Sequence, residues 1–291
     1  MPLSFLKRLL LHFRFTLAEL RSNRGKAGLL AASRYFFMRA FSPFGAGKRW
    51  QRMKSTASPE VERLRASGFC ELPPRSSAEV SALIALFLSG VGEKSGCRFD
   101  SLEGYFRHAR AAGSQRPAGV FTSGHDVLMD LLRDRSLVAL AAGYLGLPAS
   151  RLIGNANMDP LIRIDGGAPS TGYDNALRFH RDVDSYRFVK MFVYLTDCRQ
   201  GDGHHEIYLG SHLHHPLLLG PIQRYQPSEI ERLIPSARLH RVEGSAGYMF
   251  AEDTFAFHRG TVPTGKDRLI CNLQYMDDEL AAFNGPSYRV V

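Results

Sequence analysis

The sequence predicts a mainly β domain with flanking helices. Helical patterns fill residues 58–145, and alternating strand patterns replace them from Arg151 onward. Glycine and proline are frequent, with 27 and 15 residues, as in domains whose strands are joined by many turns. Because the helices precede the strands, we expect helices that cover one face of a β core.

Positive charge is concentrated at one end of the chain. Of the net charge of +9, residues 1–54 supply +11, from 12 Lys or Arg and one acid, so the remaining residues carry −2. We therefore predict a basic N-terminal segment, residues 1–55, and one folded domain, residues 56–291. A nearly neutral domain argues against nucleic acid as a partner.

The N-terminal segment has the pattern of a basic amphipathic helix. Its apolar residues recur at helical spacing: Leu6, Leu9, Leu10, Phe13, Leu17 and Leu20. Basic residues interrupt the apolar run, so it is not a secretory signal. Three interpretations stay open: packing on the folded domain or a partner, peripheral contact with a membrane, or an organelle transit peptide.

The four cysteines show no metal-binding or disulfide spacing. They are Cys70, Cys97, Cys198 and Cys271, and they indicate reduced thiols in a cytoplasmic type of compartment. No uncharged apolar run reaches the roughly 18 residues that a membrane-spanning helix needs. We expect a cytoplasmic protein, with membrane association only through the N-terminal segment.

The helical part begins with a clear capping signal. Ser58 precedes Pro59 and Glu60, and this helix is expected to end at Gly68, before a strand at 69–72. Ser77 is expected to cap the next helix, and 126–145 reads as one long helix. A short helix is expected at 228–233.

Expected strands follow at 152–157, 161–164, 188–196, 238–242 and 248–250. Gly- and Ser-rich residues 166–175 read as a loop, either a lid or a plain connection. In the strand at 188–196, Lys190, Phe192 and Tyr194 share one face, and Val189, Met191 and Val193 share the other.

His180 and Asp182 form the first candidate metal motif. In an extended segment, side chains two residues apart point to the same face, which places an imidazole beside a carboxylate. His258, 78 residues later, would complete a set of two histidines and one carboxylate. This arrangement leaves coordination positions open and is typical of non-haem Fe(II) oxygenases.

Residues 255–275 read as strand, turn and strand. If the turn is centred near Pro263, His258 faces Arg268 across a hairpin. An arginine can hold a carboxylate through two parallel N–H bonds, which a lysine cannot do. A metal site with an adjacent arginine is the arrangement used to bind a dicarboxylic co-substrate such as 2-oxoglutarate.

These motifs resemble those of phytanoyl-CoA dioxygenase-like Fe(II)/2-oxoglutarate oxygenases. The resemblance covers residues 56–276 and rests on His180-Arg-Asp182, the Gly203 to His212 segment, and His258 with Arg268. Leu209 and Phe192 stand where members often have Pro and Trp. An intact Asp182 argues against the related halogenases.

The resemblance implies a double-stranded β-helix core, also called a jelly-roll or cupin-like core. It implies Fe(II) held by His180, Asp182 and His258. It also implies O2 and 2-oxoglutarate as co-substrates, with the far carboxylate of 2-oxoglutarate on Arg268. The reaction expected is hydroxylation of a C–H bond in a small or lipid-linked substrate.

Three further side chains are candidate co-substrate contacts. Lys190 and Tyr194 lie on the more polar strand face, and Thr261 lies in the turn between His258 and Arg268. Asn272 and Gln274 follow Arg268 by even steps, so all three share one strand face. Each of these residues could equally serve packing or surface roles.

A histidine-rich stretch offers a rival metal set. It combines His204 and Glu206 with His212, His214 or His215, but glycine turns would separate these ligands. Two alternative functions also stay open: a catalytically silent jelly-roll protein that binds a metal or ligand, and a cupin-like metalloenzyme that does not use 2-oxoglutarate.

Overall fold

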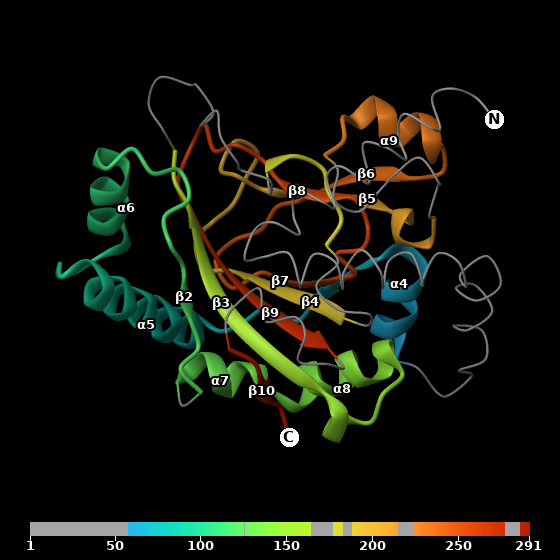
Figure 1. Cartoon of the computed structure of the whole chain (residues 1–291), viewed down its shortest axis with the longest axis horizontal. Helices are drawn as coiled ribbons and strands as arrows, with labels where there is room; N and C mark the ends of the chain where they lie inside the picture. Colours follow the sequence, from blue (N-terminus) through green and yellow to red (C-terminus); the bar gives the residue numbers. More distant parts are fainter. Residues whose placement is uncertain (1–57, 125, 164–176, 183–187, 215–223, 277–285) are drawn as a thin grey trace, which may run out of the picture.

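Two β-sheets face each other in the computed structural model of this chain, and helices cover the outer face of the larger sheet (Figure 1). The structure describes residues 58–124, 126–163, 177–182, 188–214, 224–276 and 286–291. The predicted basic segment, residues 1–55, and the loop at 166–175 lie outside the described residues. Their expected roles therefore stay predictions.

The major sheet has seven strands. Six follow the order β1-β7-β4-β9-β3-β10, and β2 also pairs with β3. In chain order their bounds are β1 Phe69–Leu72, β2 Val120–Phe121, β3 Ile153–Leu161, β4 Phe188–Tyr194, β7 Met249–Glu252, β9 Arg268–Met276 and β10 Tyr288–Arg289. All of the pairings are antiparallel. The central strands β4, β7 and β9 are almost entirely buried, as expected of a layer covered on both sides.

The minor sheet has three strands in the order β6-β5-β8. Their bounds are β5 His205–Leu209, β6 Arg238–Val242 and β8 His258–Gly260. An apolar cluster lies between the two sheets and is made of Phe69, Phe192, Tyr194, Cys198, Ile207, Val242, Phe250, Ala256 and Ile270. The described strands form two open sheets that pack face to face, and they do not close into a barrel.

Helices lie on the side of the major sheet away from the minor sheet (Figure 1). Their bounds are α4 Pro59–Ser67, α5 Ser77–Ser95, α6 Leu102–Ala111, α7 Val127–Leu132 and α8 Arg135–Leu145. A 3-10 turn at Ala149–Arg151 follows them, and another at Ser211–Leu213 follows β5. The last helix, α9 Pro227–Leu233, lies on the opposite side, beside β5 and β6.

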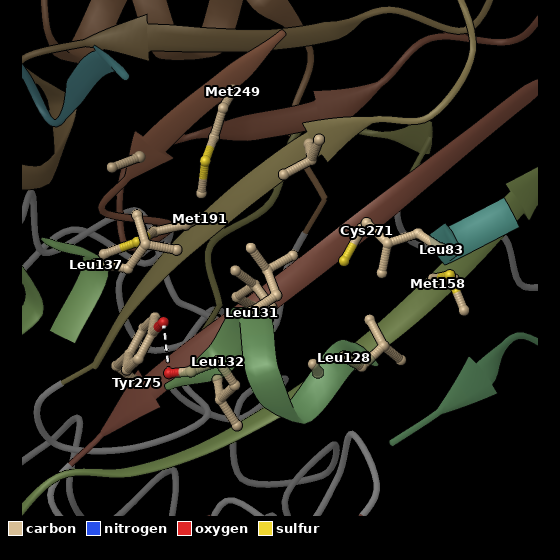
Figure 2. Close-up of a cluster of buried hydrophobic side chains, with 14 of the residues drawn as sticks. Leu83, Leu128, Leu131, Leu132, Leu137, Met158, Met191, Met249, Cys271 and Tyr275 are labelled. Carbon is tan, nitrogen blue, oxygen red and sulfur yellow. Dashed lines mark hydrogen bonds between the residues drawn. The ribbon is translucent and has the colours of Figure 1, made fainter. Parts of the chain in front are cut away.

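The alternation of side chains along the strands separates two chemical environments. Odd-numbered residues of β4 and β9, including Met191 and Cys271, pack against α7 and α8 in the main core, where Tyr275 also donates a hydrogen bond to the Leu132 carbonyl (3.0 Å; Figure 2). Even-numbered residues of both strands, including Phe192 and Ile270, face the minor sheet. The predicted division of faces at 188–196 is therefore confirmed.

The predicted long helix at 126–145 is wrong in one respect: two helices occupy this stretch. Asp126 caps α7, and Asp134 caps α8 by accepting hydrogen bonds from the backbone N–H groups of Ser136 and Leu137. Asp134 also binds Arg75 at 2.8 Å. A carboxylate that caps a helix can therefore start a new helix even where the apolar spacing predicts that one helix continues.

The predicted strand at 152–157 is longer than expected, because β3 continues through Pro160 to Leu161; of the second predicted strand, 161–164, residues 162 and 163 lie outside β3 and residue 164 lies outside the described residues. Pro160 does not break β3 and lies in register with Leu269 of β9. On its other edge, β3 pairs with β2 only at Asn157 and Met158. A proline without an N–H is tolerated where one edge of a strand has no partner.

The predicted hairpin across Pro263 is also wrong. His258 lies on β8 in the minor sheet, whereas Arg268 begins β9 in the major sheet. β8 pairs with β5, and β9 pairs with β3 and β4. The two residues therefore lie on different sheets, because local strand and turn signals do not specify which strands pair.

Within the residues that the structure describes, no helix combines the length and the apolar character needed to cross a bilayer.

The Asp134 cap yields a stability prediction. Replacing Asp134 with Ala removes the α8 cap and the contact with Arg75, so we expect the free energy of unfolding to fall by about 1–2 kcal/mol. Urea denaturation followed by circular dichroism measures the change. The matched variant is Asp130→Ala, at an exposed position of α7, which should stay within about 0.5 kcal/mol of the native protein. Equal effects of the two substitutions would contradict the capping role.

Candidate metal centre

The site is built on a backbone bridge between two distant histidines. The His180 N–H donates to the His258 carbonyl (3.0 Å), and the His258 N–H donates to the His180 carbonyl (3.1 Å). The Asp182 N–H then bonds the Thr254 carbonyl (2.9 Å). This antiparallel pairing extends the minor sheet beyond β8 and fixes the register of the two segments.

Three side chains converge from this bridge. The Nε2 atom of His180 lies 3.5 Å from Oδ1 of Asp182, and the Nε2 atom of His258 lies 3.4 Å from Oδ2 of the same carboxylate. One ligand atom from each residue lies within 4.8 Å of the others, and this is the only such group among the described residues. Neighbouring ligands of one octahedral ion are about 3 Å apart, so the three side chains fit a common divalent ion.

Backbone carbonyls set the orientation of both imidazole rings. Nδ1–H of His180 donates to the Arg178 carbonyl (2.8 Å), and Nδ1–H of His258 donates to the Ala256 carbonyl (3.0 Å). With the proton held on Nδ1, each Nε2 atom directs its lone pair toward Asp182. The donor set therefore suits a metal ion that accepts nitrogen and oxygen ligands.

The electrostatics of the three groups differ. Burial lowers the pKa of His180 to about 4, and the neighbouring His258 adds to this shift. Burial alone would raise the pKa of Asp182, but Lys190 and His258 hold that pKa well below its usual range. Burial also disfavours protonation of His258, but the Asp182 carboxylate outweighs it and raises the pKa of His258.

Arg181, between the two predicted ligands, fastens the site to the neighbouring segment. Its side chain is buried and donates hydrogen bonds to the carbonyls of Ser211 (3.0 Å) and His214 (2.7 Å). Its guanidinium carbon lies 4.0 Å from the centre of the Phe257 ring. The hydroxyl of Ser211 in turn accepts a hydrogen bond from the Phe257 N–H (2.8 Å). Arg181 and Ser211 thus connect the residues adjacent to His180, Asp182 and His258.

Arg268, the predicted co-substrate arginine, is buried and points between the sheets. Its Nη1 atom donates to the Gly203 carbonyl, while its Nε atom makes no hydrogen bond to any described residue. Both terminal nitrogens lie against Gly260, within 3.7 Å of where a Cβ atom would stand there. Gly260 follows His258 by two residues, so the guanidinium faces β8 beside the site.

The other predicted co-substrate contacts have partners inside the protein. The Lys190 ammonium lies 2.7 Å from Oδ2 of Asp182 and thus contacts the metal motif itself. The Tyr194 hydroxyl donates to the Val242 carbonyl (2.8 Å) and accepts from the His205 N–H (3.1 Å). The Thr261 hydroxyl lies 3.1 Å from both the carbonyl and Nδ1 of His204. These contacts argue against Tyr194 and Thr261 as co-substrate ligands and give Lys190 a different partner from the one predicted.

The rival histidine-rich set does not converge. His204 and Glu206 do meet, with Nε2 of His204 3.4 Å from Oε1 of Glu206, but no third described member joins them and Glu206 also pairs with Arg259 (2.8 Å) and Arg241 (3.3 Å). The His212 ring makes a hydrogen bond to the carbonyl of Arg65 (3.0 Å), a residue 147 positions earlier in the sequence. His215 lies outside the described residues. The described members of this set therefore bind their own neighbours and do not form a second metal-capable group.

The sequence analysis did not single out Glu252 or His205, which both lie next to the site. Glu252 ends β7, fully buried, and its carboxylate contacts both His205 and the back of His258. The available signal was the alternation in β7, which puts Glu252 on the same face as Phe250. An acidic residue on an interior face carries a large desolvation penalty, which indicates a specific partner.

Comparisons with known proteins show the fold. No protein-family model matches the chain, and no curated protein matches its sequence. Among solved structures, it is similar to the non-haem α-ketoglutarate-dependent carbocyclase SnoK from nogalamycin biosynthesis (TM-score 0.53, 18% identity, 77% of this chain and 85% of that one). It is also similar to EctD from S. alaskensis, solved with 2-oxoglutarate and 5-hydroxyectoine (TM-score 0.51, 16% identity, 75% of each chain).

A third similar structure is the non-haem α-ketoglutarate-dependent epimerase SnoN, also from nogalamycin biosynthesis (TM-score 0.50, 18% identity, 75% of this chain and 82% of that one). At such low identity, these similarities establish a shared fold. The chain therefore shares the fold of these three proteins.

The Arg181 contacts yield a second stability prediction. Arg181→Leu leaves the buried Ser211 carbonyl and the partly buried His214 carbonyl without their donor, so we expect the free energy of unfolding to fall by about 2–4 kcal/mol, measured by urea denaturation. Arg181→Lys keeps the charge but loses the planar fork, and it should recover only part of the loss. If Arg181→Leu is as stable as the native protein, the hydrogen bonds of Arg181 do not stabilise the site.

The electrostatics of the site predict how metal binding depends on pH. Metal ligation requires a neutral His258, whose pKa is raised, whereas His180 is already neutral above about pH 5. The affinity for Co(II) should therefore rise with pH, by up to about tenfold per unit, until the pH exceeds the His258 pKa. Calorimetric titrations at several pH values measure this dependence. A pH-independent affinity near neutrality would contradict the raised pKa.

Proposed function

We propose that this chain is a non-haem Fe(II)- and 2-oxoglutarate-dependent dioxygenase of the phytanoyl-CoA dioxygenase-like type, with a double-stranded β-helix core. As an oxidoreductase it would hydroxylate a C–H bond of a small or lipid-linked substrate. His180, Asp182 and His258 would hold the iron. Arg268 would bind the far carboxylate of 2-oxoglutarate, and O2 would be the second co-substrate.

The observation that carries this proposal is the convergence of His180, Asp182 and His258. Two Nε2 atoms and one carboxylate meet within 4.8 Å, from segments 78 residues apart. Both imidazoles are oriented for ligation by their Nδ1 hydrogen bonds. Two histidines and one carboxylate on one side of an ion leave positions for a co-substrate and O2, the arrangement of non-haem Fe(II) oxygenases.

The bound iron would supply the oxidation of the substrate by O2 at the expense of 2-oxoglutarate. The chain's own residues would bind and orient the reactants. Arg268 offers N–H donors on a buried guanidinium, which suits a carboxylate that has lost its water. Lys190 holds one oxygen of Asp182 and so limits how that carboxylate can turn toward the ion.

The polarity of the inner face favours a small polar substrate over a hydrocarbon chain. Lys190, Gln274 and Asn155 stand in one row across β4, β9 and β3, and all three are buried. In the next row, Asn272 and Asn157 are in register. Amide atoms of Asn155, Asn157 and Asn272 have no hydrogen-bond partner among the described residues. Covering each of these amide atoms with an apolar ligand would cost about 1–3 kcal/mol.

SnoK is described as a carbocyclase and SnoN as an epimerase, so enzymes of this fold carry out more than hydroxylation. Two alternatives remain: a catalytically silent protein of this fold, and a cupin-like metalloenzyme without 2-oxoglutarate. Intact His180, Asp182 and His258 favour an enzyme over the first, and Arg268 favours 2-oxoglutarate over the second.

A spectroscopic titration tests the proposal. We expect 2-oxoglutarate, added to anaerobic Fe(II)-loaded protein, to produce the weak visible charge-transfer band of a chelated keto acid. Asp182→Ala should abolish the band by removing an iron ligand. Arg268→Ala should keep the band but require about 10–100-fold more 2-oxoglutarate, because one charge-assisted carboxylate contact is lost.

The matched control is Arg259→Ala. Arg259 neighbours His258 in sequence but binds Glu206 (2.8 Å), so its loss should leave 2-oxoglutarate binding unchanged. Iron binding without a band would exclude 2-oxoglutarate chemistry and favour the metalloenzyme alternative. Failure to bind Fe(II) at all would favour the catalytically silent protein.

A further inference from the structure

A buried carboxylate lies behind His258, on the side away from the three converging ligand atoms. Oε1 of Glu252 is 3.8 Å from Nδ1 of His258, and Oε2 is 2.6 Å from Nε2 of His205. The rings of His205 and His258 stack, with centres 5.5 Å apart and planes 14° apart. Strands β5, β7 and β8 thus each contribute one member of this group, which joins the two sheets.

Among the described residues, the ion-pair partners of Glu252 are two histidines, His205 and His258, and no lysine or arginine. The Glu252 side chain is fully buried, at the end of a strand whose four residues are all buried. Neither carboxylate oxygen completes a well-aligned hydrogen bond with any described residue. Burying a carboxylate is costly unless a nearby cation or donor compensates. Stability of the fold alone would be better served by an apolar side chain at this position.

The charges around Glu252 suit a cation at the candidate metal centre. Glu252 is in register with Lys190 on β4, and the ammonium of Lys190 is taken by Asp182 at 2.7 Å. A divalent ion held by His180, Asp182 and His258 would place positive charge on the other side of the His258 ring from Glu252, which favours a buried carboxylate at this position.

We propose that Glu252, together with His205, is a positioning group for His258 that strengthens metal binding at the centre. The inference rests on the proposed function to the extent that the three ligands hold a divalent ion. At 3.8 Å the carboxylate is too far to replace the Ala256 carbonyl as acceptor, so it acts through its charge. His205 holds the plane of the His258 ring by stacking on it and links it to Glu252.

Carboxylates behind metal-bound histidines raise the basicity of the ligand and fix its orientation. Removing such a partner typically weakens metal binding by about 10–100-fold. A purely structural role for Glu252 predicts something different. In that case the neutral isostere would change the stability of the protein and leave its metal affinity intact.

The test is a Co(II) titration of the full-length protein, followed by calorimetry and by the visible absorption bands of the bound ion. We expect Glu252→Gln to weaken Co(II) binding by about 10–100-fold. Glu252→Asp keeps the charge and should recover part of the affinity. His205→Phe keeps a stacking ring but loses the contact with Glu252, so its affinity should lie between those of the native protein and Glu252→Gln.

Glu206→Gln is the matched control. Glu206 is also a buried carboxylate on β5, next to His205 in sequence, but it binds Arg241 and Arg259. Its substitution should lower stability without changing the Co(II) affinity. If Glu252→Gln behaves in the same way, the positioning role is overturned and Glu252 is structural only.

The outcomes separate this inference from the proposed function. If the native protein binds no Co(II) or Fe(II), both fail together. If it binds the metal and 2-oxoglutarate, but neither Glu252→Gln nor His205→Phe changes the Co(II) affinity, only this inference fails. Should Glu252→Gln not fold, His205→Phe decides: native affinity in that variant overturns the proposal.

Discussion

The site depends on the pair of backbone hydrogen bonds between His180 and His258. Each residue donates to the other's carbonyl, so two segments 78 residues apart are held in one register. A slip of one residue would turn one imidazole away from Asp182, because side chains alternate across a strand. The position of Asp182 follows from the same pairing through its bond to the Thr254 carbonyl. The strand pairing that extends the minor sheet is therefore the same pairing that brings the three candidate ligands together.

The major sheet separates packing from chemistry by the alternation of its side chains. One face of β4 and β9 enters the helical core, where apolar burial supplies most of the stabilisation. The other face carries Lys190, Asn272, Gln274 and Arg268 toward the minor sheet. Polar groups can be kept there because the sheet that carries them is already stabilised from its other side. A rigid scaffold of this kind holds polar side chains in place for ligands.

Charge around the centre is arranged in opposing pairs. Lys190 contacts Asp182, Arg181 is held by backbone carbonyls and aromatic rings, and Glu252 lies behind His258. Each buried charge thus has a nearby compensating group, which limits its desolvation penalty. The Asp182 carboxylate and the Glu252 carboxylate flank the His258 ring, so both act on the same imidazole.

The sequence by itself determined the local features of this protein. Helix caps, strand periodicity and the spacing of His180 and Asp182 act over a few residues, so most elements and the candidate ligands could be predicted. Where two local signals competed, as at Asp134, apolar periodicity alone gave the wrong helix. Only the tertiary structure decided that His258 and Arg268 lie on opposite sheets, that Lys190 meets Asp182, and that Glu252 lies behind His258. These contacts depend on which strands pair, and strand pairing is set by long-range packing that no short stretch of sequence encodes.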